Sequence, residues 1–189
     1  MPDRCPWCES SDLYRNYHDN EWGKPVFDDR VHFEFLVLES AQAGLSWITV
    51  LKKRENYRRA YDNFDPKKVA AYGEKKIAAL LEDPGIIRNR LKILSSINNA
   101  RLFLDIQKEF GSFSDYIWGF TKGKPVTGKW KTMAEVPART ELSDQIAADM
   151  KKRGFKFLGS IILYSHMQAT GIVNDHIRSC FRYRELTGS

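Results

Sequence analysis

Residues 31–43 of the chain read VHFEFLVLESAQA, a mostly apolar run that contains two carboxylates. Asp28 and Asp29 precede the run, and aspartate side chains commonly cap the start of a helix. Gly44 follows it, and glycine commonly ends a helix. We therefore predict a helix through this segment, with largely apolar side chains along its length.

The flanking sequence also predicts helices. Ser46 can cap the segment WITVLKKRENYRRAYDNF at 47–64, and Asp65 with Pro66 can begin a helix over KKVAAY at 67–72. Apolar periodicity and capping signals indicate further helices over 87–110, 111–120, 140–154, 161–171 and 174–183, whereas 121–139 mixes glycine, proline and lysine as loops do. We find no convincing strand pattern and no internal repeat. The predicted fold class is all-α.

Length and composition limit the possibilities further. The 189 residues fit one domain over 1–189, or two tightly joined helical lobes, and the 42% hydrophobic content indicates an ordered globular protein. The sequence has no membrane-spanning apolar run and no signal peptide at its start, so we expect a cytoplasmic protein that does not enter membranes. A net charge of +6 is compatible with a nucleic-acid partner, although many basic proteins bind none.

The cysteines raise the question of a metal site. His176 and Cys180 are four positions apart in a segment with helical character, which would place both on one helical face. Cys5 and His18 could supply a second pair of ligands, and two sulfurs with two imidazoles suit tetrahedral zinc. The alternative is that these residues are unrelated, because the spacing of thirteen is not that of a standard zinc finger.

Cys8 completes the motif CPWC with Cys5. A thioredoxin-like redox pair would need a βαβ pattern, and none is present. A zinc deaminase would need H-x-E before its cysteine pair, and here the order is reversed. Cys8 is therefore interpreted as a spare thiol or as an alternative ligand to Cys5.

Glu39 follows four apolar residues in the predicted central helix, and no positive charge is nearby along the chain. An unpaired buried carboxylate is costly, so Glu39 has a partner elsewhere, belongs to a functional site, or is partly exposed on an ordinary helix. Trp47 begins the next helix, just beyond Leu45. It is either an aromatic platform for a flat ligand near Glu39 or part of the core.

The segment KKRGFKFLG at 151–159 places Gly154 and Gly159 between a basic helix end and another helix. Such a hairpin can bring backbone N–H groups against phosphate, helped by the dipole of the following helix. Lys151, Lys152, Arg153 and Lys156 would add charge. An ordinary capped helix and tight turn would give the same pattern.

Several stretches together resemble one family. CPW, YHDNEWG, LESAQAGLSWITVLKKRENYR, GIIRNRLKI, KKRGFKFLG, YSHMQATG and VNDHIRSC occur in the order typical of the DNA-3-methyladenine glycosylase I family, a branch of the helix-hairpin-helix superfamily. The similarity extends from Cys5 to about Cys180. Agreement of this length is far more specific than any single motif above.

The resemblance implies a single-domain, monofunctional enzyme that hydrolyses the N-glycosidic bond of 3-methyladenine in double-stranded DNA. It implies one structural zinc per chain that joins the two terminal segments, and the following site residues. The zinc ligands would be Cys5, His18, His176 and Cys180, and the catalytic residue would be Glu39. The base would contact Tyr17 and Trp47, with Tyr14, Trp7 and Trp22 as weaker candidates. DNA would contact Gly44, Leu45, Gly154, Lys156 and Gly159.

A lesion methylated at N3 is cationic within the nucleotide, so its glycosidic bond is already weak. We therefore expect the enzyme to flip the base out of the duplex, stack it on Trp47 and contact its amine through Glu39, with Leu45 wedged into the stack. Asp175 is interpreted as a capping carboxylate or as a partner of the adjacent zinc ligand. We expect a monomer. The alternative function is a non-catalytic helix-hairpin-helix DNA-binding module with structural zinc.

Overall fold

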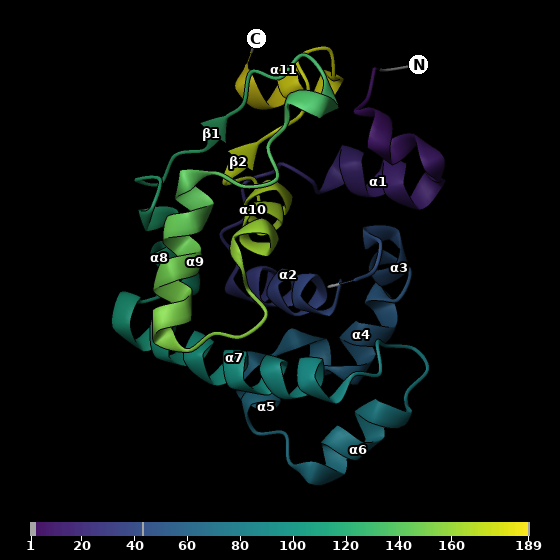
Figure 1. Ribbon diagram of the computed structural model, residues 1–189, viewed down its shortest axis with the longest axis vertical. Helices are drawn as coiled ribbons and strands as arrows, with labels where there is room; N and C mark the ends of the chain where they lie inside the picture. The colour runs from purple at the N-terminus through teal and green to yellow at the C-terminus, as the bar shows by residue number, and fades with distance from the viewer. Residues whose placement is uncertain (1–2, 43, 189) are drawn as a thin grey trace.

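The computed structural model describes residues 3–42 and 44–188, and helix α2 (Asp29–Gln42) lies at its centre. Every side chain of α2 from His32 to Ala41 is buried, and a helix that is buried on all sides must be surrounded by other elements. Figure 1 shows α2 between α10 (Ser160–Ala169) and α7 (Arg90–Phe110). The predicted central helix is confirmed, although Ala43 lies outside the described residues.

The remaining elements are helical apart from one pair of very short strands. The helices are α1 (Asp12–Asn20), α3 (Trp47–Leu51), α4 (Arg54–Ala60), α5 (Pro66–Ala70), α6 (Glu74–Glu82), α8 (Phe113–Gly119), α9 (Glu141–Arg153) and α11 (Phe181–Thr187), with 3-10 turns η1 (Pro6–Ser10), η2 (Asp62–Phe64) and η3 (Met133–Glu135). Strands β1 (Val126–Thr127) and β2 (Val173–Asn174) pair in parallel, with Val126 opposite Val173.

The predicted all-α class is confirmed in outline, because the chain is mostly helical. Asp65 caps α5 with Pro66 in its first turn, and α9 ends at Gly154 in the left-handed conformation. The β1–β2 pair was not expected from the loop-like sequence at 121–139, and the prediction missed α6.

Two predicted helix boundaries were wrong. The helix expected over 47–64 is divided, because the chain tightens into a turn at Lys52–Lys53 and Asp62–Phe64 adopts positive φ angles. The helix expected over 174–183 begins only at Phe181. His176 and Cys180 therefore do not share a helical face; Cys180 is the residue that precedes α11.

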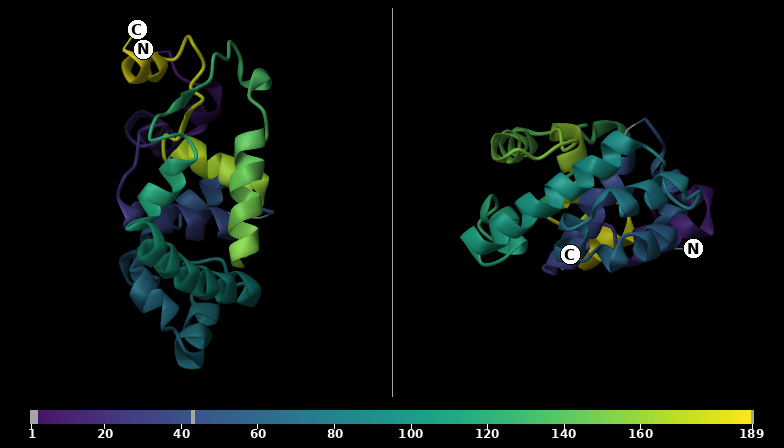
Figure 2. Two further views of the ribbon diagram at one scale, coloured as in Figure 1. Left: turned by 90° about the vertical axis from the view of Figure 1, so that its left-hand side faces the viewer. Right: turned by 90° about the horizontal axis from the view of Figure 1, so that it is seen from below.

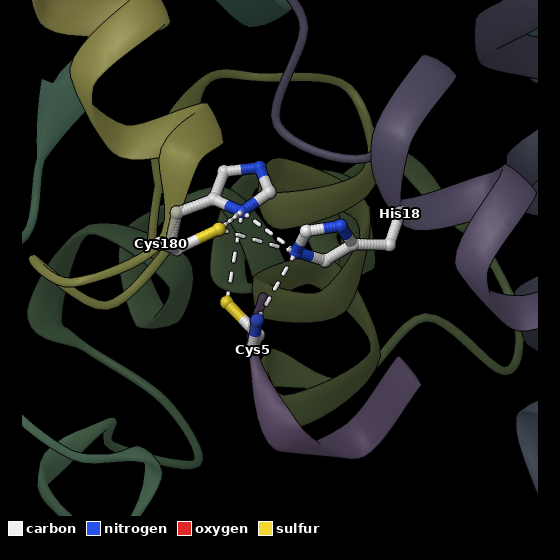
Figure 3. Close-up of side chains that lie close together, drawn as sticks. Cys5, His18 and Cys180 are labelled. Carbon is white, nitrogen blue, oxygen red and sulfur yellow. Dashed lines mark hydrogen bonds between the residues drawn. The ribbon is translucent and has the colours of Figure 1, made fainter. Parts of the chain in front are cut away.

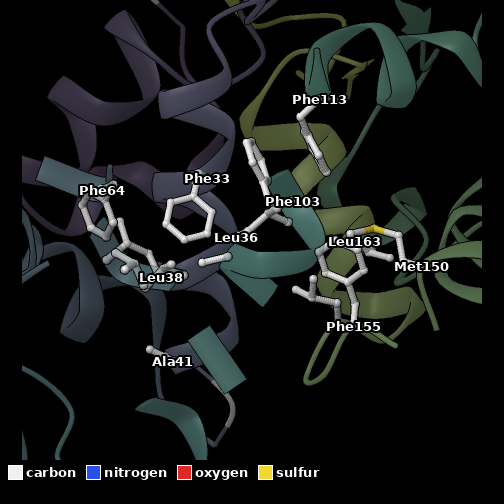
Figure 4. Close-up of a cluster of buried hydrophobic side chains, with 14 of the residues drawn as sticks. Phe33, Leu36, Leu38, Ala41, Phe64, Phe103, Phe113, Met150, Phe155 and Leu163 are labelled. Carbon is white, nitrogen blue, oxygen red and sulfur yellow. The ribbon is translucent and has the colours of Figure 1, made fainter. Parts of the chain in front are cut away.

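The core packs around α2. Figure 4 shows Phe33 of α2 beside Phe103 of α7, which also stacks on Phe113 of α8, with ring centroids 5.2 and 4.4 Å apart. Leu163 of α10 and Met150 of α9 complete the opposite side. Each such buried side chain contributes on the order of 2 kcal/mol. No helix within the described ranges is both long and apolar enough to cross a bilayer.

The two aspartates at the start of α2 have different hydrogen-bond partners. Asp28 accepts hydrogen bonds from the first backbone N–H groups of α2, at Arg30 and Val31. Asp29 instead accepts from the backbone N–H groups of Phe113 and Ser114, both at 2.8 Å, and from the Gln107 amide at 2.6 Å. Asp29 thus joins the start of α2 to the start of α8.

Asp29→Ala is expected to lower the free energy of unfolding by about 2 kcal/mol, because three partly buried donors lose their acceptor. Urea denaturation measures the difference. Asp105→Ala is the control, since Asp105 is exposed and pairs with the exposed Lys108 on the same helix. This change should cost less than about 0.5 kcal/mol. Equal losses in the two variants would contradict the proposed link between α2 and α8.

Candidate functional site

A pocket of about 280 Å³ opens beside the second half of α2. Its walls come from η1, α1 and the residues after it, α2, α3, η3 and α10, and five of the eleven lining residues are aromatic. All of the predicted base-contacting residues line this one pocket, together with Glu39 and with residues that the sequence interpretation did not select. The lining residues are Trp7, Tyr14, Tyr17, Trp22, Glu39, Gln42, Trp47, Met133, Ser165, Gln168 and Ala169.

The aromatic walls support one another. The Trp7 ring meets Tyr14 and Trp22 edge-on, with centroids 5.4 and 5.2 Å apart. Tyr17 lies 5.8 Å from Trp47, which also stacks against Phe35 of α2 at 6.3 Å. Trp47 is therefore fixed from behind while it forms part of the pocket wall, a suitable arrangement for stacking on a flat ligand.

The Glu39 carboxyl group lies at the inner end of this pocket. Only 2% of the residue is exposed, and burial raises its pKa well above the usual value. Its Oε2 atom is 2.9 Å from Nδ1 of His166, whereas Oε1 has no hydrogen-bond partner among the described residues. An unpaired buried oxygen at a pocket wall is an acceptor available to a ligand.

His166 and His32 connect Glu39 to the backbone. His166 Nε2 is 3.1 Å from His32 Nδ1, and His32 Nε2 donates to the carbonyl oxygen of Val26 at 3.0 Å. Burial lowers the pKa of each histidine to about 3. Neither residue was selected as a site residue from the sequence. The available signal was that the chain has four histidines, two of which had no assigned role, while Glu39 needed a buried partner.

The four predicted metal ligands meet where the two terminal segments lie side by side (Figures 1 and 2). Their ligand atoms all lie within 4.8 Å of one another, and all four residues are buried. Figure 3 shows Cys5, His18 and Cys180 pointing toward a common centre. His176 Nδ1 lies 3.2 Å from His18 Nε2 and 3.6 Å from Cys5 Sγ, and Cys180 Sγ lies 3.5 Å from each of these two histidine nitrogens.

The outer nitrogens of the two imidazoles are already hydrogen-bonded. His18 Nδ1 is 2.8 Å from Asp19, which also pairs with Arg4, and His176 Nε2 donates to the backbone oxygen of Trp22 at 3.0 Å. The inner nitrogens, His18 Nε2 and His176 Nδ1, therefore remain for the centre, where they lie beside the two cysteine sulfurs. Two imidazoles oriented from outside and two sulfurs fit a metal ion held by four protein ligands.

Cys8 and Asp175 lie outside this centre. The Cys8 thiol donates to the backbone oxygen of Cys5 at 3.1 Å, so it does not replace Cys5 as a ligand. Asp175 accepts from the side chains of Trp130, Tyr164 and Gln168. The carboxylate that supports a histidine ligand is therefore Asp19, and the interpretation of Asp175 as that partner was wrong.

The hairpin between α9 and α10 is held from below by α7. Gly154 has a φ angle of 100°, which closes α9, and Gly159 precedes the first turn of α10. Lys156 is exposed, while its backbone N–H and C=O both bond to the side chain of Asn99 at 2.9 Å. Asn99 was not identified from the sequence, because nothing local indicates that it binds a segment more than fifty residues away.

Arg153 is not available for phosphate in the way the sequence suggested. It pairs with Glu109 and Asp149, and its guanidinium lies over the rings of Phe110 and Tyr116. The exposed cations at the hairpin are Lys151, Lys152 and Lys156.

The turn after α2 presents Gly44 and Leu45. Gly44 has a φ angle of +82° and an open surrounding, and Leu45 is 40% exposed although it is apolar. Ser46 bonds to the Thr49 side chain at 2.8 Å and makes no capping bond to the backbone of α3. The turn therefore carries an apolar side chain into solvent directly before the Trp47 wall.

Comparisons with known proteins agree with this arrangement. The model of the methyladenine glycosylase family matches residues 7–183. DNA-3-methyladenine glycosylase 1 of Escherichia coli (strain K12) is 49% identical over 181 residues, covering 96% of this chain and 97% of that protein. A DNA-3-methyladenine glycosylase of Haemophilus influenzae is 46% identical over 180 residues, covering 95% and 97%.

Solved structures give the same result. A crystal structure of 3-methyladenine DNA glycosylase I (TAG) matches with a TM-score of 0.91 and 50% identity, over 95% of this chain and 98% of that one. The Staphylococcus aureus enzyme, studied for the structural basis of 3-methyladenine recognition, matches with a TM-score of 0.91 and 36% identity, over 94% and 95%. The family match covers the aromatic pocket, Glu39 and the hairpin, and this chain belongs to the methyladenine glycosylase family.

Proposed function

We propose that this protein is a monofunctional DNA repair glycosylase that hydrolyses the N-glycosidic bond of 3-methyladenine in alkylated double-stranded DNA. The observation that carries the proposal is the unpaired Oε1 atom of Glu39 inside an aromatic pocket. A non-catalytic DNA-binding module would need the hairpin. It would have no use for a buried carboxyl group with an unpaired oxygen at the wall of an aromatic pocket. We propose that the chain acts as a cytoplasmic monomer, with residues 1–189 forming one catalytic unit.

The reaction needs no protonation of the leaving base by the protein. A base methylated at N3 is cationic in the nucleotide, so it leaves without being protonated. The pocket must extract the base from the duplex, hold it, and favour the lesion over normal bases. Trp47 and Tyr17 offer ring faces for stacking, and Glu39 Oε1 accepts a hydrogen bond from the exocyclic amine. Leu45, exposed in the turn before Trp47, is suited to fill the gap in the base stack.

The α9–α10 segment serves in this proposal as the hairpin of a helix-hairpin-helix motif. Glycines at both ends allow close backbone approach to phosphate, and the start of α10 adds a favourable dipole. Asn99 fixes the backbone of Lys156 with one donated and one accepted hydrogen bond. The contact between the hairpin and the DNA backbone thus depends on the buried side-chain amide of Asn99 in α7.

The metal proposed for the four-ligand centre is one structural zinc ion. Bond lengths of about 2.3 Å to sulfur and about 2.0 Å to nitrogen in a tetrahedron place neighbouring ligand atoms roughly 3.3–3.8 Å apart. The observed separations of 3.2–3.6 Å are close to this range. Four protein ligands leave no position for a catalytic water, so zinc would stabilise the pocket wall and take no part in the reaction.

Glu39→Gln is expected to reduce the release of free 3-methyladenine from methylated DNA by about a hundredfold, because the pocket loses a carboxylate that can face the cationic base. Chromatography of the released bases measures the rate, with 7-methylguanine as the base that should not be released. Glu55→Gln, which changes an exposed carboxylate, is the control and should retain full activity. Full activity of Glu39→Gln would contradict the role of Glu39, and wild-type protein that binds methylated DNA without releasing base would favour the non-catalytic module.

Elemental analysis of purified protein is expected to find one zinc per chain. Cys180→Ser should lose the metal and unfold at a lower temperature. A zinc site contributes on the order of 10 kcal/mol to the folding free energy of small zinc domains, and a smaller share is expected here because the helical core also stabilises the fold. Cys8→Ser should keep the metal, because its thiol points to a backbone oxygen. Metal-free wild-type protein of undiminished stability would count against the zinc assignment.

Asn99→Leu is expected to weaken binding to undamaged duplex DNA by about tenfold, because the backbone of Lys156 in the hairpin loses both of its bonds to the Asn99 side chain. The affinity for free 3-methyladenine should not change, since the pocket is lined by other elements. Fluorescence anisotropy and calorimetry measure the two affinities. Asn20→Leu, on an exposed face of α1, is the control and should change neither affinity. If Asn99→Leu weakened both affinities equally, the result would indicate general unfolding instead of a local loss at the hairpin.

A further inference from the structure

Asp175 is a buried carboxylate to which the reaction described above gives no role. Only 1% of the residue is exposed, and its two oxygens accept hydrogen bonds from three side chains. Trp130 Nε1 donates to Oδ1 at 2.6 Å, Gln168 Nε2 donates to Oδ2 at 2.9 Å, and the Tyr164 hydroxyl also donates to Oδ2. Burial and then the bond to Asp175 raise the pKa of Tyr164, so this hydroxyl keeps its proton and Asp175 is the acceptor.

The position of Asp175 is fixed by the segment that joins β1 to α9. A β carbon at Gly128 would lie 2.2 Å from Trp130 Nε1 and 2.6 Å from Asp175 Oδ1, so only glycine leaves room for their hydrogen bond. The backbone N–H of Gly128 donates to the Asn174 oxygen, and that of Arg178 donates to the Trp130 oxygen, both at 2.9 Å. The carboxylate is therefore held between two segments that are bonded to each other.

Gln168 links Asp175 to the pocket. Asp175 does not line the pocket, whereas Gln168 does. An amide nitrogen only donates, so the bond to Asp175 turns Nε2 of Gln168 toward the carboxylate and leaves Oε1 as the free end of the amide. Within residues 3–42 and 44–188 this oxygen has no hydrogen-bond partner. The negative charge at the nitrogen end also polarises the amide and strengthens its oxygen as an acceptor.

Gln168 belongs to the outer part of the pocket. The inner wall is made of buried side chains, which are Tyr17, Trp22, Glu39 and Ala169. Gln168 and the other lining residues are partly exposed. A base that enters the pocket occupies the inner part, so the sugar attached to it stays at the outer part. The free oxygen of Gln168 is therefore at the end of the pocket where C1′ of the nucleotide would lie.

Two other polar residues of the outer part are not oriented in this way. Gln42 makes no side-chain hydrogen bond to any residue that the structure describes, and the Ser165 hydroxyl donates to the Ile161 oxygen of its own helix at 3.2 Å. Neither of them is fixed by a buried charge. Gln168 thus differs from both, because a carboxylate behind the pocket wall determines which way its amide faces.

We propose that Gln168 holds the water molecule that attacks C1′, and that Asp175 is the positioning residue that orients the Gln168 amide. This inference rests on the proposed function, which supplies the sugar and the reaction. In GTPases a glutamine side chain orients the attacking water in the same manner. An amide is too weak a base to remove a proton from water, so the role of Gln168 is to place the water.

The step balances with water as its second reactant. The bond between C1′ and N9 breaks and its electron pair leaves with the base, which departs uncharged, while C1′ becomes part of an oxocarbenium ion. One O–H group of the water donates to Gln168 Oε1, at an oxygen–oxygen distance of about 2.8 Å, and this directs a lone pair of the water toward C1′. That lone pair forms the new C1′–O bond, and the other proton of the water passes to solvent at the open end of the pocket.

Two variants test the two residues separately. Gln168→Leu removes the acceptor and keeps a side chain of similar size. Asp175→Asn keeps the shape of the side chain but offers Gln168 both a donor and an acceptor, so the amide can turn either way. Gln145→Leu is the control, because Gln145 is an exposed residue of α9 that does not line the pocket.

The rate of 3-methyladenine release from methylated DNA is expected to fall about tenfold in Gln168→Leu and about threefold in Asp175→Asn, because an oriented hydrogen bond to the water is lost or weakened. Both variants should bind free 3-methyladenine within about twofold of the wild type by calorimetry. Equal losses of rate and of this affinity in Gln168→Leu would make Gln168 a contact of the base and overturn the proposal.

Reaction in mixtures of water and methanol gives a readout that a merely structural role would not move. Methanol that reaches C1′ leaves a methyl glycoside in the DNA, whereas water leaves a free abasic site, and mass spectrometry of the DNA separates the two products. The wild type should favour water, because the fixed acceptor orders one water at C1′. The share of methyl glycoside is expected to rise by at least about threefold in Gln168→Leu and to stay unchanged in Gln145→Leu.

An unchanged share of methyl glycoside in Gln168→Leu would overturn the proposal, whatever its rate. In Asp175→Asn the share should lie between those of the wild type and Gln168→Leu. Its zinc content is measured as well, because Asp175 is adjacent in sequence to His176, and it should equal that of the wild type. Loss of zinc in Asp175→Asn would instead assign Asp175 to the metal centre and overturn its role as a positioning residue.

The outcomes distinguish this inference from the proposed function. Wild-type protein that releases no 3-methyladenine from methylated DNA would refute the function itself. Wild-type protein that releases the base, with a Gln168→Leu variant that matches it in both rate and share of methyl glycoside, would refute only the role assigned to Gln168.

Discussion

The structure depends on the burial of one carboxyl group in the middle of its central helix. Glu39 belongs to a helix that is covered on every side, so solvent cannot compensate its charge. The cost is offset by the bond to His166, which in turn requires α10 to pack directly on α2. The packing of α10 on α2 is thus also the contact that orients the acceptor in the pocket.

The second constraint is the centre formed by Cys5, His18, His176 and Cys180. It joins residues separated by more than 150 positions, and it fixes the start of the chain against the segment that follows β2. The aromatic wall is made of short elements, η1 and α1, that bury little surface of their own. Arg54 adds to this support, because it pairs with Glu21 after α1 and with Glu34 of α2, both at 2.6 Å. The ion pairs of Arg54 therefore help to hold the end of α1, and with it the aromatic wall, against α2.

Much of this arrangement could be predicted from the sequence, and the failures have physical causes. Helix α2, the cap at Asp65 and the end of α9 follow from local signals, and the family resemblance supplied the pocket and metal residues. His166 could not be paired with Glu39, because 127 positions separate them and only the fold brings them together. The segment 174–183 reads as helical by spacing, but Val173–Asn174 pairs with β1, and His176 and Cys180 meet Cys5 and His18 in a buried cluster. The helix therefore begins only at Phe181. Asp19 and Asp175 are each adjacent in sequence to a predicted ligand, so the sequence could not show which carboxylate bonds to its neighbour. In the fold Asp19 bonds to His18, whereas Asp175 accepts from side chains of other segments.

Discrimination between the lesion and normal adenine cannot come from the hydrogen bond to Oε1 alone, because both bases carry the same exocyclic amine. Aromatic walls do not supply it either, since every base has a face that stacks on Trp47. One added methyl group changes the fit to an apolar wall by only about 1–3 kcal/mol. Charge is the property that changes completely on methylation at N3, and it weakens the glycosidic bond before the protein acts. The pocket therefore has to hold the extracted base in position, for which it offers aromatic ring faces and one free acceptor. The bond from His166 fixes Oε2 of Glu39 and leaves Oε1 as that acceptor.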